Sequence, residues 1–139
     1  MSPNSIKYYL VVVMSVVLSI TSMESCQKAP INGDLDGQWQ VASVTPRPSQ
    51  IIVNERLYYN FGMHVCMLTY YEGWFLSANM EYDGKTMRLD FPYVSSEEDY
   101  IILRQYGITE NPVAFNLRFE GSHRLVLWND DTEITLIKL

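Results

Sequence analysis

Apolar and polar residues alternate in short segments from residue 37 to residue 139. In Gly37–Thr45, Trp39, Val41 and Ser43 share one face and glutamines occupy the other. A period of two is typical of strands that bury one face. Continuing along the chain in this way gives eight strands. The other seven are two strands within 56–70, followed by 74–82, 86–91, 113–120, 123–128 and 132–139.

Turn residues separate these segments. Asp83-Gly84 is the strongest hairpin signal, because this pair favours the tight turns that match the twist of paired strands. Asn60-Phe61-Gly62 predicts a turn or bulge that divides 56–70, and Pro46 ends the first strand. Further turns are expected at Glu72-Gly73, Gly121-Ser122 and Asn129-Asp130-Asp131.

One helix is predicted, over residues 96–106. Ser95 and Glu98 have the spacing of a capping box, acidic residues fill the first turn, and Gly107 is placed to cap the far end. Ile102, Leu103 and Tyr106 would then face the sheet.

Eight antiparallel strands joined by short turns favour an all-β, up-and-down barrel, because closure removes the exposed strand edges. A β-sandwich is the alternative. An eight-stranded barrel has an interior that side chains fill or that holds one small ligand.

The amino-terminal segment has the pattern of an export signal. Lys7 precedes an apolar run from Tyr8 to Ile20, which is shorter than the about 20 residues that a membrane-spanning helix needs. An uncleaved membrane anchor is the alternative, but Glu24 would then lie at the edge of a short span, where a charge is costly. We therefore predict that residues 1–25 are a signal peptide.

Met23, Ser25 and Cys26 resemble the lipobox of bacterial lipoproteins. The resemblance implies that Cys26 becomes the first residue and carries fatty acyl groups, including palmitate, that hold the protein on a membrane. The alternative for Cys26 is an ordinary thiol. Gln27 is not the aspartate that retains some lipoproteins at the inner membrane, and no acidic cluster follows Cys26. This implies the outer membrane, facing the periplasm, with residues 26–36 as a lipidated tether and 37–139 as the domain.

Charge and cysteine content narrow the alternatives. The formal net charge is −6, and no basic stripe is present, so we expect no nucleic-acid partner. If Cys26 is acylated, Cys66 has no partner for a disulfide and is expected to be a buried, inert thiol. A Cys66 nucleophile assisted by His64 on the same strand face is the remote alternative.

The sequence has no nucleotide-binding loop, zinc-ligand spacing or nucleophile elbow. His64 and His123 are far apart and are expected to be ordinary histidines. The acidic residues at the helix start could offer oxygen ligands to calcium, but a solvated helix start explains them more simply. We therefore predict no catalytic residue, no metal and no cofactor.

Gly37-Gln38-Trp39 resembles the start of the first strand in lipocalins and in small bacterial lipocalin-like lipoproteins, many of which have no assigned activity. The likeness extends over about 35–139 and includes the leader with its cysteine, the strand 57–61 and the strand–turn–strand 80–91. It implies that Trp39 plugs one end of the barrel under an arginine from a late strand, either Arg118 or Arg124.

Aromatic residues are frequent in the predicted domain, and their polar tips suit a ligand pocket or a protein interface. Trp39, Tyr59, Met80 and Tyr82 are the candidates to line a ligand site, although core packing also explains each of them. We predict a non-enzymatic lipoprotein of the cell envelope that binds a small apolar or amphipathic ligand. The alternative is a module that binds another envelope protein and has a barrel filled with side chains.

Overall fold

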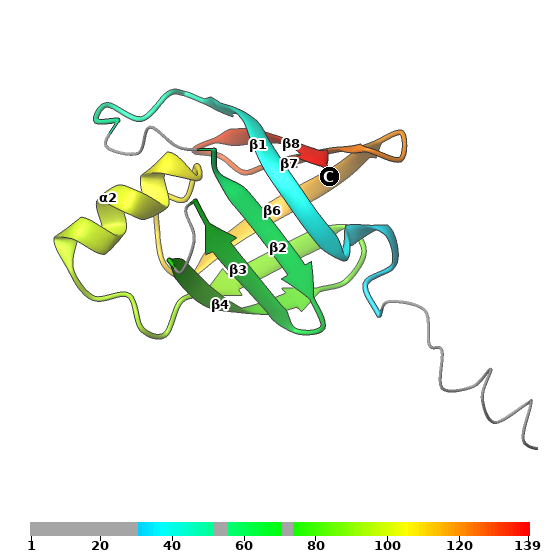
Figure 1. Cartoon of the computed structure of the whole chain (residues 1–139), viewed down its shortest axis with the longest axis horizontal. Helices are drawn as coiled ribbons and strands as arrows, with labels where there is room; N and C mark the ends of the chain where they lie inside the picture. Colours follow the sequence, from blue (N-terminus) through cyan, green and yellow to red (C-terminus); the bar gives the residue numbers. More distant parts are fainter. Residues whose placement is uncertain (1–30, 52–55, 71–73) are drawn as a thin grey trace, which may run out of the picture.

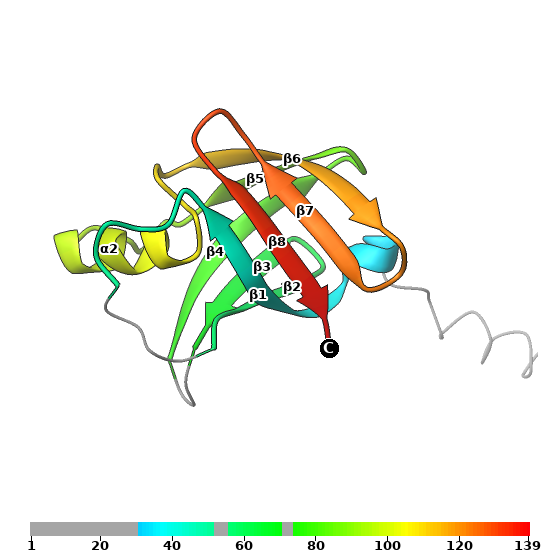
Figure 2. The same ribbon diagram turned by 90° about the horizontal axis from the view of Figure 1, so that it is seen from above.

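A computed structural model describes residues 31–51, 56–70 and 74–139. Within them, eight strands form one antiparallel sheet in sequence order, and the last strand pairs with the first. Figure 2 shows β8 beside β1, where the sheet closes into a barrel. The predicted up-and-down barrel with one short helix is confirmed, and the sandwich alternative is wrong. The strands are β1 (Gly37–Thr45), β2 (Tyr58–Gly62), β3 (Val65–Thr69), β4 (Phe75–Tyr82), β5 (Thr86–Asp90), β6 (Val113–Glu120), β7 (Arg124–Trp128) and β8 (Glu133–Lys138).

Side-chain alternation places the core inside the barrel. In β6, Val113, Phe115 and Leu117 are buried while the residues between them are exposed. In β1 the alternation shifts at a bulge between Val41 and Ser43, which turns Val44 toward the core and exposes Ser43. The prediction that Ser43 shares the buried face of Trp39 is therefore wrong.

The break predicted at 60–62 is also wrong, because these residues belong to β2. The connection between β2 and β3 is the two-residue turn of Met63 and His64, and Met63 adopts a positive φ of 54°. Tyr59 of β2 pairs with Leu68 of β3 in this register, so both inward faces stay apolar.

The helix α2 (Glu97–Gln105) begins one residue later than predicted. Ser96, rather than Ser95, is the N-cap, and its Oγ accepts a hydrogen bond of 3.1 Å from the Asp99 N–H. At the other end the predicted glycine cap is present. Gly107 has a φ of 84°, and the N–H groups of Gly107 and Ile108 donate to the carbonyls of Arg104 and Leu103.

The barrel has two unlike ends. Figure 1 shows α2 across one end and the short blue η1 (Gly33–Leu35) at the other. We call them the α2 end and the η1 end. The η1 end also contains the turns 63–64, 83–85 and 121–123. There, the Leu139 N–H donates a hydrogen bond to the Gln38 carbonyl of β1.

Part of the segment that we assigned to the tether is folded against the barrel. Leu35 is completely buried, and the Asn32 side chain donates to an Asp36 carboxylate oxygen at 2.7 Å and to the Met63 carbonyl at 2.8 Å. The packed domain therefore includes residues before Gly37. Among the apolar residues of this mainly polar stretch, Leu35 makes this contact.

Candidate functional site

The four residues predicted to line a ligand site all face the interior. Trp39 of β1 lies opposite Tyr59 of β2, and both side chains are completely buried. Met80 of β4 is buried, and Tyr82 at the end of that strand is half-buried and packs against the core. All four therefore belong to the core of the barrel, and their role as ligand contacts stays a prediction.

Trp39 closes the η1 end. Its Nε1–H donates to the Leu35 carbonyl at 2.8 Å, which fixes the ring under η1. The Lys138 ammonium nitrogen lies 5.3 Å from the centre of the ring and donates to the Asp34 carbonyl at 2.9 Å. A lysine from the last strand thus supplies the cation that covers Trp39.

The expectation that Arg118 or Arg124 covers Trp39 is wrong. Both arginines point away from the interior because each alternates with an inward leucine on its strand. The Arg118 guanidinium lies 5.2 Å from the centre of the Trp128 ring, and Arg124 forms an ion pair of 3.0 Å with Glu120.

The α2 end is closed by the end of α2 and the residues after it. Leu103, Tyr106 and Ile108 are buried against the barrel core. The Tyr59 hydroxyl donates to the Tyr106 carbonyl at 2.5 Å, and the Tyr106 hydroxyl donates to the Thr69 carbonyl at 2.6 Å. Burial raises the pKa of both tyrosines above the ordinary value, so both stay neutral donors.

A hollow of about 490 Å³ lies between β1, the segment after it and α2. We call it the α2 hollow. Val41, Val44 and Leu57 line it and also pack against the core, so the hollow opens directly over the barrel's interior packing. In the register of β1 with β2, the paired residues of β1 are Gly37–Gln40. The hollow therefore lies beyond the paired part of these two strands.

Polar groups occupy one side of the α2 hollow. Gln105 of α2 is almost fully buried, and its Nε2 donates to the Gln50 carbonyl at 2.6 Å and to the Ile101 carbonyl at 3.2 Å. These bonds join α2 to the segment after β1. Arg47 carries the one charge among the described residues that line the hollow.

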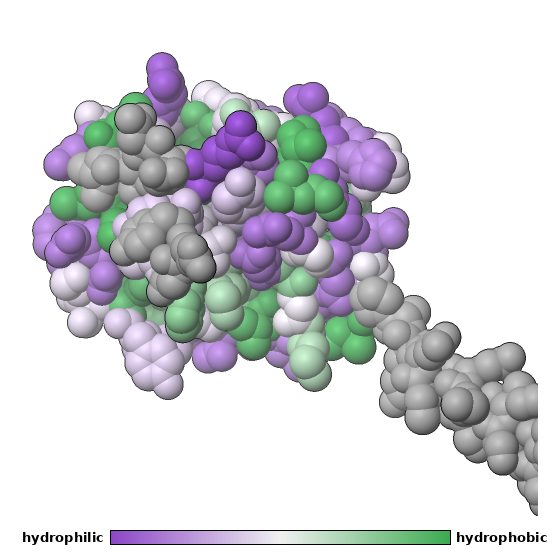
Figure 3. All heavy atoms as spheres, in the orientation of Figure 1, coloured by the Kyte–Doolittle hydropathy of each residue, from purple (hydrophilic) through white to green (hydrophobic). Residues whose placement is uncertain are grey.

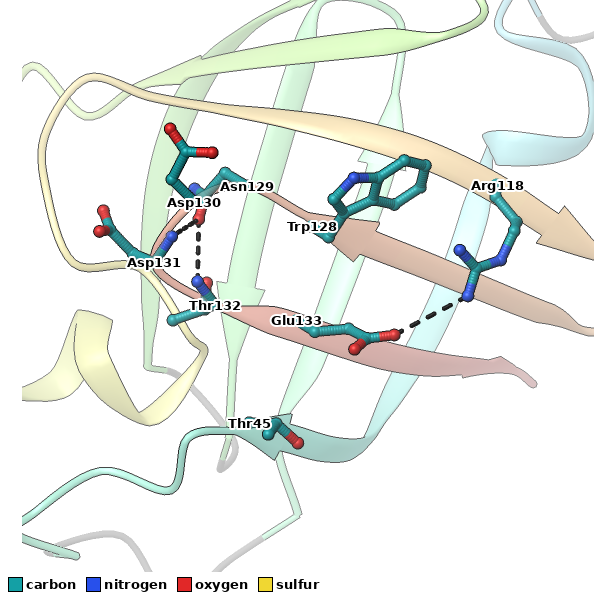
Figure 4. Close-up of a pocket in the computed structure, with 8 residues that line it drawn as sticks. All are labelled: Thr45, Arg118, Trp128, Asn129, Asp130, Asp131, Thr132 and Glu133. Carbon is teal, nitrogen blue, oxygen red and sulfur yellow. Dashed lines mark hydrogen bonds and ion pairs between the residues drawn. The ribbon is translucent and has the colours of Figure 1, made fainter.

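A second hollow, of about 330 Å³, lies outside the barrel at the end of β7 and the start of β8. Figure 4 shows Trp128 beside Arg118, whose Nη2 lies 3.8 Å from a Glu133 carboxylate oxygen. The Asn129 side-chain oxygen accepts hydrogen bonds from the backbone N–H groups of Asp131 and Thr132. The polar groups that line this second hollow thus bond to one another. The predicted turn at 129–131 is present.

Cys66 does not have the surroundings of a nucleophile. It is completely buried, and burial raises the pKa of its thiol, so the unreactive neutral form is favoured. His64 lies in the exposed turn between β2 and β3 rather than on the strand face of Cys66. The remote alternative, in which His64 and Cys66 share one strand face, is therefore wrong.

Neither a metal centre nor a membrane-spanning helix is found in the part of the chain that the structure describes. There, no three His, Cys, Asp or Glu side chains gather in a way that could hold a metal ion. No helix in the same residues is both long and apolar enough to cross a bilayer. The predicted lipid attachment residue, Cys26, lies outside the described residues.

The residues that line the α2 hollow were not among the predicted site residues. Val41 and Val44 come from β1, whereas Gln105 comes from α2, far along the chain. The alternation of β1 assigns Val41 to the buried face, but no local pattern brings β1 and α2 together. That juxtaposition depends on the closure of the barrel.

Comparison with known proteins agrees with this geometry. A family model described as a lipocalin-like domain matches residues 18–139. The crystal structure of a lipocalin-like protein from Bacteroides uniformis is similar, with a TM-score of 0.59 and 18% identity over 77% of this chain and 100% of that one. A protein from Bacteroides eggerthii described as uncharacterized has a TM-score of 0.54 and 11% identity, over 75% of this chain and 98% of its own. No curated protein matches the chain.

Proposed function

The chain belongs to the family of lipocalin-like domains, and from this premise we propose that it is a lipid-anchored envelope protein that binds one small amphipathic ligand at its α2 end. The observation that carries the proposal is the α2 hollow. Its volume of about 490 Å³ lies within the range of about 300–1,000 Å³ that is typical of small-molecule sites.

The lining of the α2 hollow favours an amphipathic ligand over a wholly apolar one. Val41, Val44 and Leu57 provide an apolar floor over the core, and Arg47 and Gln105 lie at its polar side. A hydrocarbon tail would contact the floor, and an anionic head group would pair with the Arg47 guanidinium. The ligand class is therefore an acyl chain or a similar apolar body with one negative group.

The anchor is proposed from the amino-terminal sequence. Lys7, the apolar run after it and Ser25 precede Cys26 in the order that export and acylation require. Two or more acyl chains give stable membrane attachment, whereas one gives only marginal binding. With Gln27 after the cysteine, we place the protein on the outer membrane, facing the periplasm.

We expect the wild-type protein to incorporate radiolabelled palmitate in its host and to sediment with membranes. Cys26→Ser should abolish the label and move the protein to the soluble fraction, because the thiol that we predict to be acylated is lost. Cys66→Ala is the matched control, and it should keep both the label and the sedimentation. Unchanged labelling and sedimentation of Cys26→Ser would show that the anchor is elsewhere.

We expect Ala42→Trp to weaken ligand binding about tenfold, or about 1.4 kcal/mol. Ala42 lines the α2 hollow and is exposed, so a large ring there fills the hollow without entering the core. Binding is measured by the fluorescence of anilinonaphthalene sulfonate, an anionic amphiphile, and by its displacement with fatty acids. Arg47→Gln should weaken binding of the anionic probe more than binding of a neutral analogue of similar shape.

Ala114→Trp provides the matched control for the hollow. Ala114 is also an exposed alanine on a strand, but it lies on β6 and lines none of the described hollows. It should leave probe binding unchanged. Equal affinities of Ala42→Trp and the wild type would mean that the ligand does not occupy the α2 hollow.

A second function, binding of another envelope protein, is supported by a different observation. Large side chains fill the interior, and Phe75 and Tyr93 are exposed by 56% and 85%, away from the η1 end. Native mass spectrometry of the protein purified gently from its host separates the two functions. A mass released on denaturation supports the ligand, whereas an empty barrel that co-purifies with one protein supports the partner.

A further inference from the structure

Exposed apolar side chains gather at the η1 end. Nine large apolar side chains are exposed among the described residues, and six of them lie at or beside this end. A soluble surface carries single apolar residues without special meaning, but a group of them at one end of a small barrel marks a contact surface. The six are Ile31 at 60%, Met63 at 70%, Val65 at 39%, Phe119 at 36%, Ile137 at 37% and Leu139 at 66% exposed.

Two hydrogen bonds and one ring contact place four of these residues on one rim. The Asn32 side chain donates to the Met63 carbonyl, so Ile31 and Met63 lie on adjoining segments. Leu139 is bonded to the start of β1, and the Phe119 ring is 6.3 Å from the Trp39 ring that closes this end. Figure 3 shows green side chains between purple ones on both halves of this face, including the half where the described chain begins.

The outer wall beside this rim is also partly apolar. A shallow hollow of about 430 Å³ crosses the outside of β1, β2 and β3, and Gly62, Val65 and Met67 contribute to its lining. Val65 belongs both to this hollow and to the exposed set, so the apolar surface continues from the rim onto the wall.

The length of the chain between Cys26 and Ile31 limits where this end can lie. Five residue steps separate the two, and a fully extended chain spans at most about 3.6 Å per residue, or about 18 Å in all. If Cys26 carries acyl chains in the membrane, the η1 end cannot be farther than this from the anchoring cysteine. Ile31, on the exposed apolar rim, then lies within this distance of the anchor.

We propose that the η1 end rests on the membrane surface, with Ile31, Met63 and Leu139 inserted between the lipid head groups. This inference rests on the proposed anchor at Cys26. The contact is apolar rather than electrostatic, because the charges on this end are mixed. Asp34 and Asp36 accompany Lys138, whose ammonium already bonds to the Asp34 carbonyl. The α2 hollow then faces away from the lipid to which the protein is anchored.

The test uses full-length, acylated protein in vesicles of phosphatidylethanolamine and phosphatidylglycerol. A nitrobenzoxadiazole label is attached at Met63→Cys or, as the matched control, at Phe75→Cys on a strand end away from the η1 end. Both positions are exposed, and the native Cys66 is buried and so protected from the label. We expect nitroxide-bearing lipids to quench the Met63 label roughly twofold and to leave the Phe75 label unchanged.

The outcomes separate the docking from the anchor. Acylated, membrane-bound protein with an unquenched Met63 label overturns the docking and leaves the anchor intact. Stronger quenching of the Phe75 label also overturns it, because the opposite end would then face the lipid. Absence of palmitate together with an unquenched Met63 label overturns both. A Met63 label that is shielded in native membranes but not quenched in vesicles means that a protein covers this end, and it too overturns the proposal.

Discussion

Gly107→Ala is expected to lower the free energy of unfolding by about 2–5 kcal/mol. Two separate costs add up. Gly107 has a φ of 84°, in the left-handed region, where alanine is disfavoured by about 1–2 kcal/mol. In addition, a Cβ at this position would lie 2.6 Å from Cγ1 of Ile134 and 3.2 Å from Cγ1 of Val44. Such overpacking costs about 1–3 kcal/mol.

Gly121→Ala separates the two costs. Gly121 also has a positive φ, of 72°, but nothing lies within 4 Å of the position of its Cβ. Gly121→Ala should lower the free energy of unfolding only by the cost of the left-handed backbone conformation, about 1–2 kcal/mol. Urea unfolding of both variants measures the difference. If the two losses are equal, the end of α2 can move away from β8 at little cost.

Alkaline pH is expected to destabilise the protein steeply, with a slope that reaches about 4 kcal/mol per pH unit above about pH 11. Burial raises the pKa of Tyr59, Tyr106 and Cys66 above their ordinary values of 10.0, 10.0 and 9.0. The folded protein then keeps three protons that the unfolded chain releases. The free energy of unfolding is therefore unaffected by these groups below about pH 8 and falls as the pH rises through the ordinary values.

The contributions can be separated by substitution. Cys66→Ala should remove the loss between pH 9 and pH 10, and Tyr106→Phe should reduce the slope above pH 10 by about 1.4 kcal/mol per unit. Tyr106→Phe also lowers stability at neutral pH by about 1–3 kcal/mol, because it leaves the Thr69 carbonyl without its donor. Tyr93→Phe, at an exposed ring, is the control. Stability that is constant to pH 11 would mean that these groups ionise inside the folded barrel.

The strands could be predicted because a barrel buries one face of each strand, which makes apolar and polar residues alternate along the sequence. The bounds of β1 and β6 agree with the prediction. The turn at 63–64 could not be found in this way, because Met63 adopts a positive φ without the glycine or asparagine that usually signals it. Gly62 instead invited a break inside β2.

The candidate site was less predictable than the fold. The alternation of β1 predicts that Trp39 faces the interior, as it does, whereas an arginine over its ring is implied by the resemblance alone. Alternation already excludes Arg118, because it directly follows Leu117, which continues the inward face of Val113 and Phe115. It favours Lys138, which follows Ile134 and Leu136 at steps of two. The α2 hollow has no such signal, because its walls meet only after the sheet has closed.

Because β1 pairs with β8, the chain could begin at another strand and still form the same closed sheet. Because Leu139 is hydrogen-bonded beside Gln38, the two ends could be linked by a short peptide and the chain reopened at Asp130, in the exposed turn between β7 and β8. A leader fused to that new start would anchor the barrel by its α2 end, so that α2 would face the bilayer. Comparing the ligand uptake of the native and inverted proteins would show whether uptake depends on which end of the barrel faces the membrane.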